Sequence, residues 1–199
     1  SDVCSSDLTP ISLVAREILQ YATTIDEAFA IAKKRQTFVS ESILIGSAND
    51  NRAAVIEKST TQTVLFKPDS NRVICTNHFQ SPEFANDELN QKQMKESASV
   101  YRYQRIQELL NESPEMDVQE AADILRDRLG LDDSDIGMGN EKAVNQLLAH
   151  HSVIFQPAKK LVWISTSPFQ LGDYVCYNID SVFSVLPKLN EQKEIRVFT

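Results

Sequence analysis

Residues 41–77 read ESILIGSANDNRAAVIEKSTTQTVLFKPDSNRVICTN, a stretch with four short runs of apolar, mostly β-branched side chains. Residues rich in Asn, Asp, Ser and Pro separate these runs at 49–51 and 68–71, where they favour turns. Short runs of this composition between turn residues are typical of successive β-strands. We therefore predict a meander of four strands, at residues 43–45, 53–57, 63–66 and 73–76.

The residues before this meander predict two amphipathic helices. Between residues 9 and 21, apolar side chains recur at helical spacing after Pro10, a residue that the first helical turn tolerates. Residues 24–27, Thr-Ile-Asp-Glu, fit a capping box that opens a second helix, which carries basic residues near its end at Arg35. Both helices are interpreted as packing elements.

The rest of the chain predicts more helices and then more strands. Residues 80–95 are polar, contain Ser81-Pro82 and predict an extended loop. Periodicity and capping signals then predict helices at about 97–111, from 117 to near 130 and at 141–149, before strands at 152–156, 161–165 and 174–179. The tail after residue 180 stays ambiguous. No repeat or composition break divides the chain, so the order predicts one α+β domain.

Composition argues against several classes of function. The 199 residues include 28 acidic and 20 basic side chains, a formal net charge of −8, without a local Lys or Arg cluster. A phosphate backbone would be repelled, so we expect no nucleic-acid partner. No apolar run approaches the length of about 20 residues that a membrane helix requires. The spacing of Cys4, Cys75 and Cys176 argues against zinc ribbons and disulfide scaffolds.

The first eight residues, SDVCSSDL, differ from the rest of the chain. They lack an initial Met, periodicity and the charged and apolar regions of a signal peptide. They match the translation of a short-read sequencing adapter, TCA GAC GTG TGC TCT TCC GAT CT completed by any base; a native polar tail is the alternative. We interpret residues 1–8 as an artefact, so that the domain starts at residue 9 and Cys4 has no function.

Asn77 and Arg102 are the residues whose positions point most directly to chemistry. Asn77 ends a predicted strand, where its carboxamide could donate to a developing oxyanion or could simply stop the strand. At about 100° per residue, Arg102 lies about 40° from Ile106 on its helix, near the apolar stripe. A guanidinium there must form an ion pair or line a cleft. Arg105 lies at the margin of the stripe and is expected to be more easily solvated.

The cysteines and histidines give weaker signals. Cys75 and His78 would point to opposite faces of a continued strand, so a packing cysteine and a loop histidine are favoured over a nucleophilic pair. The same interpretation applies to Cys176. His150 and His151 are adjacent, whereas zinc motifs place two histidines one helical turn apart.

Glu57 is a lone carboxylate inside an apolar run. A strand-edge position or an ion pair is favoured for it over a functional role. Glu57 is therefore not among the predicted site residues.

Several stretches, taken together and in order, resemble the C-terminal part of the cysteine-type N-terminal-nucleophile (Ntn) hydrolases. The resemblance covers residues 9–180 and is nearest to the isopenicillin-N-acyltransferase-like acyltransferases and hydrolases, with penicillin V acylase and choloylglycine hydrolase more distant. The stretches that carry it are Thr9-Pro10 with Arg16-Glu17-Ile18-Leu19, then 24–28, 53–59, Thr76-Asn77-His78-Phe79, Arg102-Tyr103-Gln104-Arg105, and 151–155 with 161–165.

This resemblance implies part of an αββα sandwich, with two antiparallel sheets between helical layers and the N-terminal portion missing. It implies an N-terminal cysteine, exposed by self-cleavage upstream of Thr9, that attacks a linear amide or thioester of a small molecule with its own α-amine as base. Asn77 would be an oxyanion-hole donor, and Arg102, rather than Arg105, would orient the nucleophile region. The resemblance calls for no metal or organic cofactor, and the fragment alone should be inactive.

Two other functions remain open at this point. Because the nucleophile is not in this chain, the domain could be a degenerate Ntn fold that binds rather than catalyses. A papain-like enzyme built on Cys75 is a poorer alternative, since no separated Cys, His and Asn spacing supports it. Hydrolysis versus transfer, the compartment and the oligomeric state are not specified by the sequence. Strands without their partners would make the isolated fragment prone to aggregate.

Overall fold

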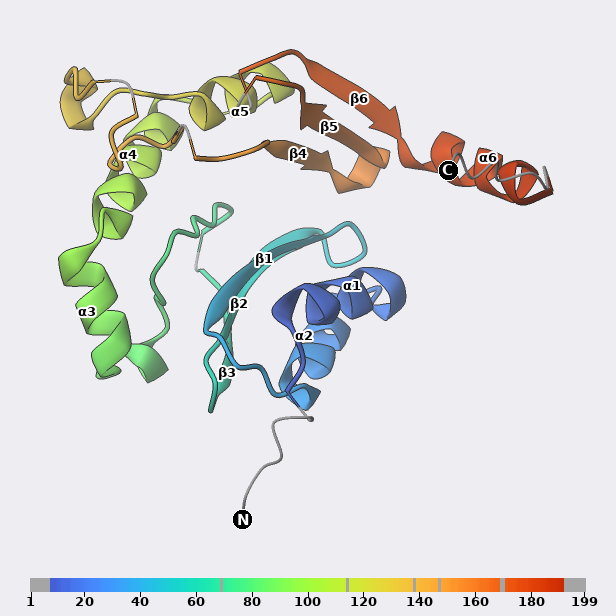
Figure 1. The fold of residues 1–199 in the computed structure, drawn as a ribbon, viewed down its shortest axis with the longest axis horizontal. Coiled ribbons are helices and arrows are strands. Elements are labelled where there is room, and N and C mark those ends of the chain that lie inside the picture. Colours follow the sequence, from blue (N-terminus) through green and yellow to red (C-terminus); the bar gives the residue numbers. More distant parts are fainter. Residues whose placement is uncertain are drawn as a thin grey trace, which may run out of the picture.

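The computed structural model describes residues 8–68, 70–113, 115–137, 139–146, 148–168 and 171–191. Within these ranges the chain forms six α-helices and two antiparallel sheets of three strands each, in the orders β1-β2-β3 and β4-β5-β6 (Figure 1). The elements are α1 Ile11–Tyr21, α2 Ile25–Lys34, β1 Glu41–Ser47, β2 Arg52–Lys58, β3 Thr63–Phe66, α3 Glu88–Glu96, α4 Ser99–Glu112, α5 Val118–Leu125, β4 Val153–Gln156, β5 Leu161–Ser165, β6 Tyr174–Asn178 and α6 Ile179–Glu191. The α+β class and the two antiparallel sheets are confirmed.

The first two helices form where the sequence predicts them. The predicted capping box is present at the start of α2, where the Thr24 side chain accepts from the Glu27 amide and the Glu27 carboxylate accepts from the Thr24 amide. Lys33 and Lys34 lie in the last turn of α2, where positive charge favours the helix dipole. Local chemistry therefore determines both ends of this helix.

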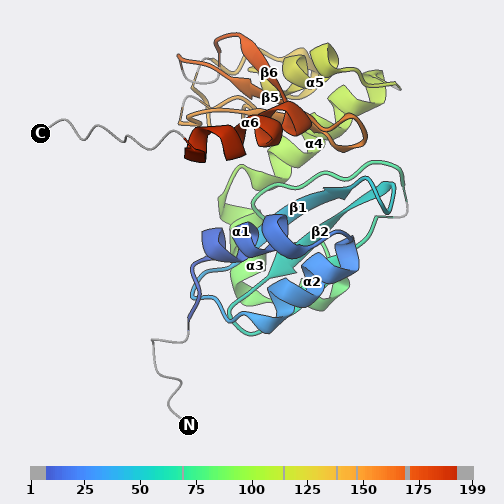
Figure 2. The same cartoon turned by 90° about the vertical axis from the view of Figure 1, so that its right-hand side faces the viewer.

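Both helices cover one face of the first sheet, and the main core lies between them (Figure 2). Ile56 of β2 sits between Ile43 of β1 and Leu65 of β3 in the sheet register. A fully buried aliphatic side chain of this kind contributes about 1.5 to 3 kcal/mol. The buried members of the cluster are Val14, Ile18, Ala28, Ala32 and Ile56.

The opposite face of β2 is also buried. Val55 and Glu57 are fully buried there, and the Phe84 side chain is 2% exposed. The segment 72–84 folds back to Glu57, whose carboxylate accepts hydrogen bonds from the amides of Gln80 and Ser81. The central strand is therefore covered on both faces, by helices on one and by irregular chain on the other.

The fourth predicted strand, residues 73–76, does not form, so that prediction was wrong. These residues have no sheet partner in the described part of the chain, and the Ile74 carbonyl accepts from the side-chain amide of Gln80 at 2.7 Å. Their β-branched composition fits a half-buried extended segment as well as it fits a strand, because β-propensity mainly reports packing on such a surface.

One loop prediction and one helix prediction were also wrong. The predicted loop 80–95 contains a 3₁₀ helix, Pro82–Phe84, and then α3, whose Asp87 cap accepts from the Asn90 amide at 2.7 Å. α3 is exposed and polar, with Asn90 as its buried residue, so it has no apolar periodicity to detect. No helix forms at 141–149, residue 147 lying outside the described residues; the Asn145 amide donates instead to the Asp127 carbonyl at 2.8 Å.

The second sheet has two different faces. On one face Tyr174 lies beneath the guanidinium of Arg126, 4.9 Å from the ring centre, which ties β6 to the end of α5. The other face carries only apolar side chains in its two central rows, Val153, Ile164 and Val175, then Phe155, Val162 and Tyr177. The chain after residue 180, which the sequence leaves ambiguous, continues α6. A missing N-terminal portion stays a prediction.

Candidate active site at the start of helix α4

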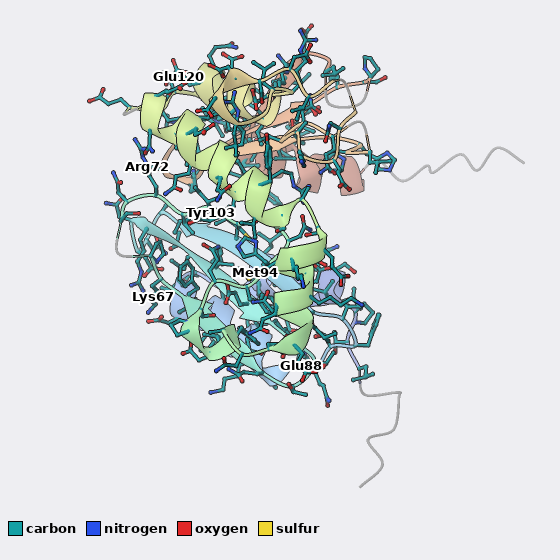
Figure 3. The ribbon with its side chains drawn as sticks, turned by 90° about the vertical axis from the view of Figure 1, so that its left-hand side faces the viewer. Lys67, Arg72, Glu88, Met94, Tyr103 and Glu120 are labelled. Atoms are coloured by element: carbon teal, nitrogen blue, oxygen red, sulfur yellow. The ribbon has the colours of Figure 1, made fainter. Side chains whose placement is uncertain are left out.

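The candidate site lies where residues 76–78 meet the first turns of α4. This helix, together with α3, joins the region of the first sheet to that of the second (Figures 1 and 3). The Arg102 Nη2 atom donates to Asn77 Oδ1 at 2.6 Å, across 25 positions of sequence. Asn77 is exposed, and with its oxygen held by Arg102 its NH₂ group remains available as a donor. The structure thus brings both predicted site residues together.

Arg102 has fewer partners than a half-buried cation normally has. Its Nε atom is buried without a hydrogen-bond partner, and no carboxylate of the described residues lies within ion-pair distance of it. Burial lowers the pKa of Arg102, with Glu141 opposing the shift. A desolvated guanidinium without a counter-ion is suited to a partner outside the described residues.

His78, the neighbour of Asn77, is locked in place by α4. Its Nδ1 atom lies 2.8 Å from Ser99 Oγ and 3.1 Å from Thr76 Oγ1, and Ser99 Oγ donates to Thr76 Oγ1 at 3.1 Å. The His78 ring meets the Tyr103 ring edge-on at 5.7 Å, and Figure 3 shows Tyr103 on α4. Side chains on both sides of Asn77 therefore anchor its backbone to the helix.

Glu57 holds the other end of this segment. Its two carboxylate oxygens accept from the amide of Gln80 at 2.5 Å and the amide of Ser81 at 3.0 Å, and also from the Ser81 hydroxyl. The prediction of a strand-edge position or an ion pair for Glu57 was wrong. Glu57 lies on the central strand, and uncharged hydrogen-bond donors of the described chain stabilise its buried carboxylate. A charge in the buried run AAVIE was the signal that could have identified it as an anchor.

A hollow of about 430 Å³ opens beside Asn77. It lies between the start of β1, the β2–β3 turn, residues 76–79 and α3. Hydroxyl and amide side chains dominate its lining, which includes two carboxylates, Glu41 and Asp87; among the described residues, Phe79 and Leu89 are its apolar members. The other lining residues are Ser40, Ser42, Ser59, Thr60, Thr61, Thr76, Asn77, His78, Asn90 and Gln93.

Arg105 is the most deeply buried basic side chain of α4, so the expectation that it is easily solvated was wrong. It is 2% exposed and donates to both oxygens of Asp127 at 3.0 Å, to Asp133 at 2.8 Å and to Glu108 at 3.2 Å. Hydrogen bonding by Asp127 raises the pKa of Arg105. The loop 126–133 covers the side of α4 that carries Arg105. The angle between Arg105 and Ile106 around the helix axis could not reveal this cover. Arg105 is a structural ion-pair centre.

The described cysteines lie outside this arrangement. Burial raises the pKa of the Cys75 thiol, whereas a nucleophilic cysteine needs a lowered one. Cys176 is exposed on β6 of the second sheet, and Cys4 lies outside the described residues. The hydrogen bonds of His78 go to Ser99 and Thr76 rather than to sulfur. These contacts agree with a packing role for Cys75, whereas the packing role expected for Cys176 was wrong, because that residue is exposed.

His150 and His151 are both exposed. No three His, Cys, Asp or Glu side chains gather as potential metal ligands in the described part of the chain. Within the same ranges, none of the helices has the length and apolar character needed to cross a bilayer.

The two antiparallel sheets with their helices are compatible with an Ntn-like α+β fold. The family model of acyl-coenzyme A:6-aminopenicillanic acid acyl-transferase matches residues 5–169. Because this match covers most of the 199 residues, the chain belongs to that acyltransferase family. No curated protein and no solved structure was found to match it.

Proposed function

We propose that this chain supplies the oxyanion donor and the orienting cation of an autoproteolytic Ntn amidohydrolase or acyltransferase. In this proposal the substrate is a small-molecule amide or acyl compound, and the nucleophile is a cysteine upstream of Thr9. Asn77 donates to the oxyanion through its NH₂ group, and Arg102 orients Asn77 and the nucleophile region. The observation that carries the proposal is the 2.6 Å hydrogen bond from Arg102 Nη2 to Asn77 Oδ1.

The chemistry follows the usual sequence of covalent acyl transfer. The cysteine sulfur bonds to the substrate carbonyl carbon while its proton passes to the cysteine's own α-amine. The carbonyl oxygen becomes an oxyanion, which the Asn77 NH₂ group stabilises. The C–N bond then breaks, the leaving amine takes the proton, and water or a second amine attacks the thioester and receives the acyl group. The arrangement calls for no cofactor, and the chain without the cysteine should be inactive.

The test uses the complete gene product, including whatever precedes Thr9. Self-cleavage just before a cysteine, detected by N-terminal sequencing and mass, should disappear when that cysteine is changed to alanine. N-acyl substrates are then screened with Asn77→Ala, Arg102→Gln and Asn86→Ala; Asn86 is exposed and lies outside the hollow. Loss of one oxyanion donor should lower kcat by about 100- to 1,000-fold in Asn77→Ala.

A degenerate, non-catalytic Ntn fold is the second candidate. Arg102, whose Nε atom is buried without a hydrogen-bond partner in the described part of the chain, would serve equally well there as a ligand-binding group. An upstream region without a cysteine, or a complete protein that neither cleaves itself nor turns over acyl substrates, would establish this candidate. Equal turnover by Asn77→Ala and Asn86→Ala would remove the proposed role of Asn77.

A further inference from the structure

The hollow beside Asn77 contains a histidine, His78, whose Nδ1 atom is held by two hydroxyl groups. A hydroxyl group has one proton, and Ser99 donates its proton to Thr76 Oγ1. With the Ser99 proton directed to Thr76, the 2.8 Å contact between Ser99 Oγ and His78 Nδ1 fits a bond in which Nδ1–H donates to the serine oxygen, and we take this tautomer as part of the inference. Because a neutral imidazole carries one proton, Nε2 is left with a free lone pair.

Nothing in the described part of the chain uses this lone pair. The hydrogen bonds of His78 involve Nδ1, and His78 is 8% exposed while lining the hollow. The buried side-chain atoms without partners are Arg102 Nε and Arg126 Nε, so His78 Nε2 is not sealed from solvent. The clamp of Ser99 on one side and Tyr103 on the other fixes the direction of this acceptor.

The charge of the hollow limits what can bind. Its described lining contains Glu41 and Asp87 but no Lys or Arg, in a chain of formal net charge −8. Phosphate groups, such as those of a coenzyme A nucleotide, would be repelled there. Few apolar side chains face the hollow, so an alkyl chain would leave its many hydroxyl and amide groups without partners.

We propose that this hollow binds the amine side of the substrate, a hydrophilic amine with hydroxyl groups, through a hydrogen bond from the ligand to His78 Nε2. The inference rests on the proposed function, because a linear amide has an amine side and acyl transfer to nitrogen has an amine acceptor. Glu41 and Asp87 add attraction for the free amine while it is protonated, and the amine must lose that proton before its nitrogen attacks the thioester. His78 is then a specificity-determining residue next to the oxyanion donor.

The acceptor is lost when His78 takes up a second proton. Burial lowers the pKa of His78 from its ordinary 6.5, with Glu57 opposing the shift. Because this pKa lies below its ordinary value, Nε2 is a free acceptor at neutral pH, and ligand binding should weaken only when the pH falls through the lowered pKa. The charged and titratable groups around His78 are Glu57 on β2, Arg102 and Tyr103 on α4, and Glu41 and Asp87 in the hollow.

The first test is an NMR titration of the 199-residue chain with three probes of matched size. The probes are 2-amino-1,3-propanediol, glycerol and glycerate, which carry a positive, zero and negative charge. We expect the aminodiol to bind most tightly and glycerate least, with the ¹⁵N resonance of His78 Nε2 moving during the aminodiol titration. Equal binding of glycerate, or an unchanged Nε2 resonance in the wild-type chain, overturns the proposal.

The second test distinguishes the role of Nε2 as a hydrogen-bond acceptor from the structural hydrogen bond between His78 and Ser99. In His78→Asn the side-chain amide can still donate to Ser99, but no Nε2 remains. We expect the aminodiol Kd to rise about three- to tenfold, the value of one hydrogen bond. His151→Asn, at an exposed histidine outside the hollow, should leave the Kd unchanged. An equal Kd in wild type and His78→Asn contradicts the proposal.

These measurements do not depend on turnover. Aminodiol binding at His78 in a complete protein without acyl transfer would refute the proposed function and keep the hollow as a binding site. Acyl transfer that depends on Asn77, without aminodiol binding at His78, would keep the function and refute this inference.

Discussion

The middle strands of the two sheets occupy the same topological position in opposite environments. In β2, four successive residues, Ala54, Val55, Ile56 and Glu57, are fully buried. In β5, Ile164 is 38% exposed, although it too lies between two antiparallel neighbours. Hydrogen bonding is similar in the two sheets, so it cannot explain the difference. The difference in burial between β2 and β5 comes from what covers the two faces of each sheet. β2 has helices on one side and folded-back chain on the other.

The difference bears directly on the site. Asn77 and His78 belong to the chain that covers β2 and are anchored to it through Glu57. The second sheet instead presents an apolar face, on which Phe155 is 66% and Tyr177 44% exposed. A precise polar arrangement needs rigid support, and the first sheet supplies it.

The largest expected difference in stability is between two substitutions of isoleucine by alanine, one in the middle strand of each sheet. Ile56→Ala removes buried atoms from the core and should lower the free energy of unfolding by about 2 to 5 kcal/mol. Ile164→Ala, at an exposed site, should cost less than about 1 kcal/mol. Urea unfolding followed by circular dichroism measures both. Similar losses would show that the second sheet is as well packed as the first.

The next largest effect concerns the connection between the two regions. Arg105 on α4 bonds to Asp127 and Asp133, so Arg105→Gln should destabilise the fold by about 1.5 to 3 kcal/mol, the range for charged hydrogen bonds. Arg128→Gln, at an exposed position, is the matched control. The variants are compared by urea unfolding. Equal stability of the two variants would mean that the buried ion pairs do not hold α4 to the loop.

Local signals in the sequence were sufficient for most of the elements. The box at Thr24 and Glu27 defined the start of α2, and short strand-like runs, the first of them rich in β-branched residues, located all six strands. These signals act over a few residues and need no knowledge of the rest of the fold. The same reasoning failed for residues 73–76, because what decides strand pairing is a partner strand and not the composition of the run.

The site was predictable only in part, because it too depends on contacts between segments that lie far apart in the sequence. The roles of Asn77 and Arg102 came from the family resemblance, but the hydrogen bond between them was not predicted, since no spacing rule connects residues that far apart. The clamp of His78 by Ser99 and the burial of Arg105 depend on how α4 packs against two loops. Helix angles place side chains on a cylinder but do not say which side the loops will cover.

A smaller effect is expected at the cap of α2, within the well-covered region. Thr24→Ala removes the acceptor for the Glu27 amide and should cost about 1 kcal/mol. Thr24→Ser keeps the acceptor and serves as the control. Thermal unfolding of both variants measures the difference. A Thr24→Ala protein as stable as Thr24→Ser would show that packing on the sheet, rather than the cap, fixes the start of this helix.

The smallest effect on stability, but a clear one on solution behaviour, is expected on the apolar face of the second sheet. Val175 is 40% exposed on the edge strand β6, so Val175→Lys should change the free energy of unfolding by less than about 0.5 kcal/mol. A lysine on an exposed edge opposes strand-to-strand association, so the variant should self-associate less in analytical ultracentrifugation. Lys160→Arg, which keeps a positive charge at an exposed position, is the control. Unchanged association together with a large loss of stability would mean that this face is covered in solution, and the contrast between the two sheets would then disappear.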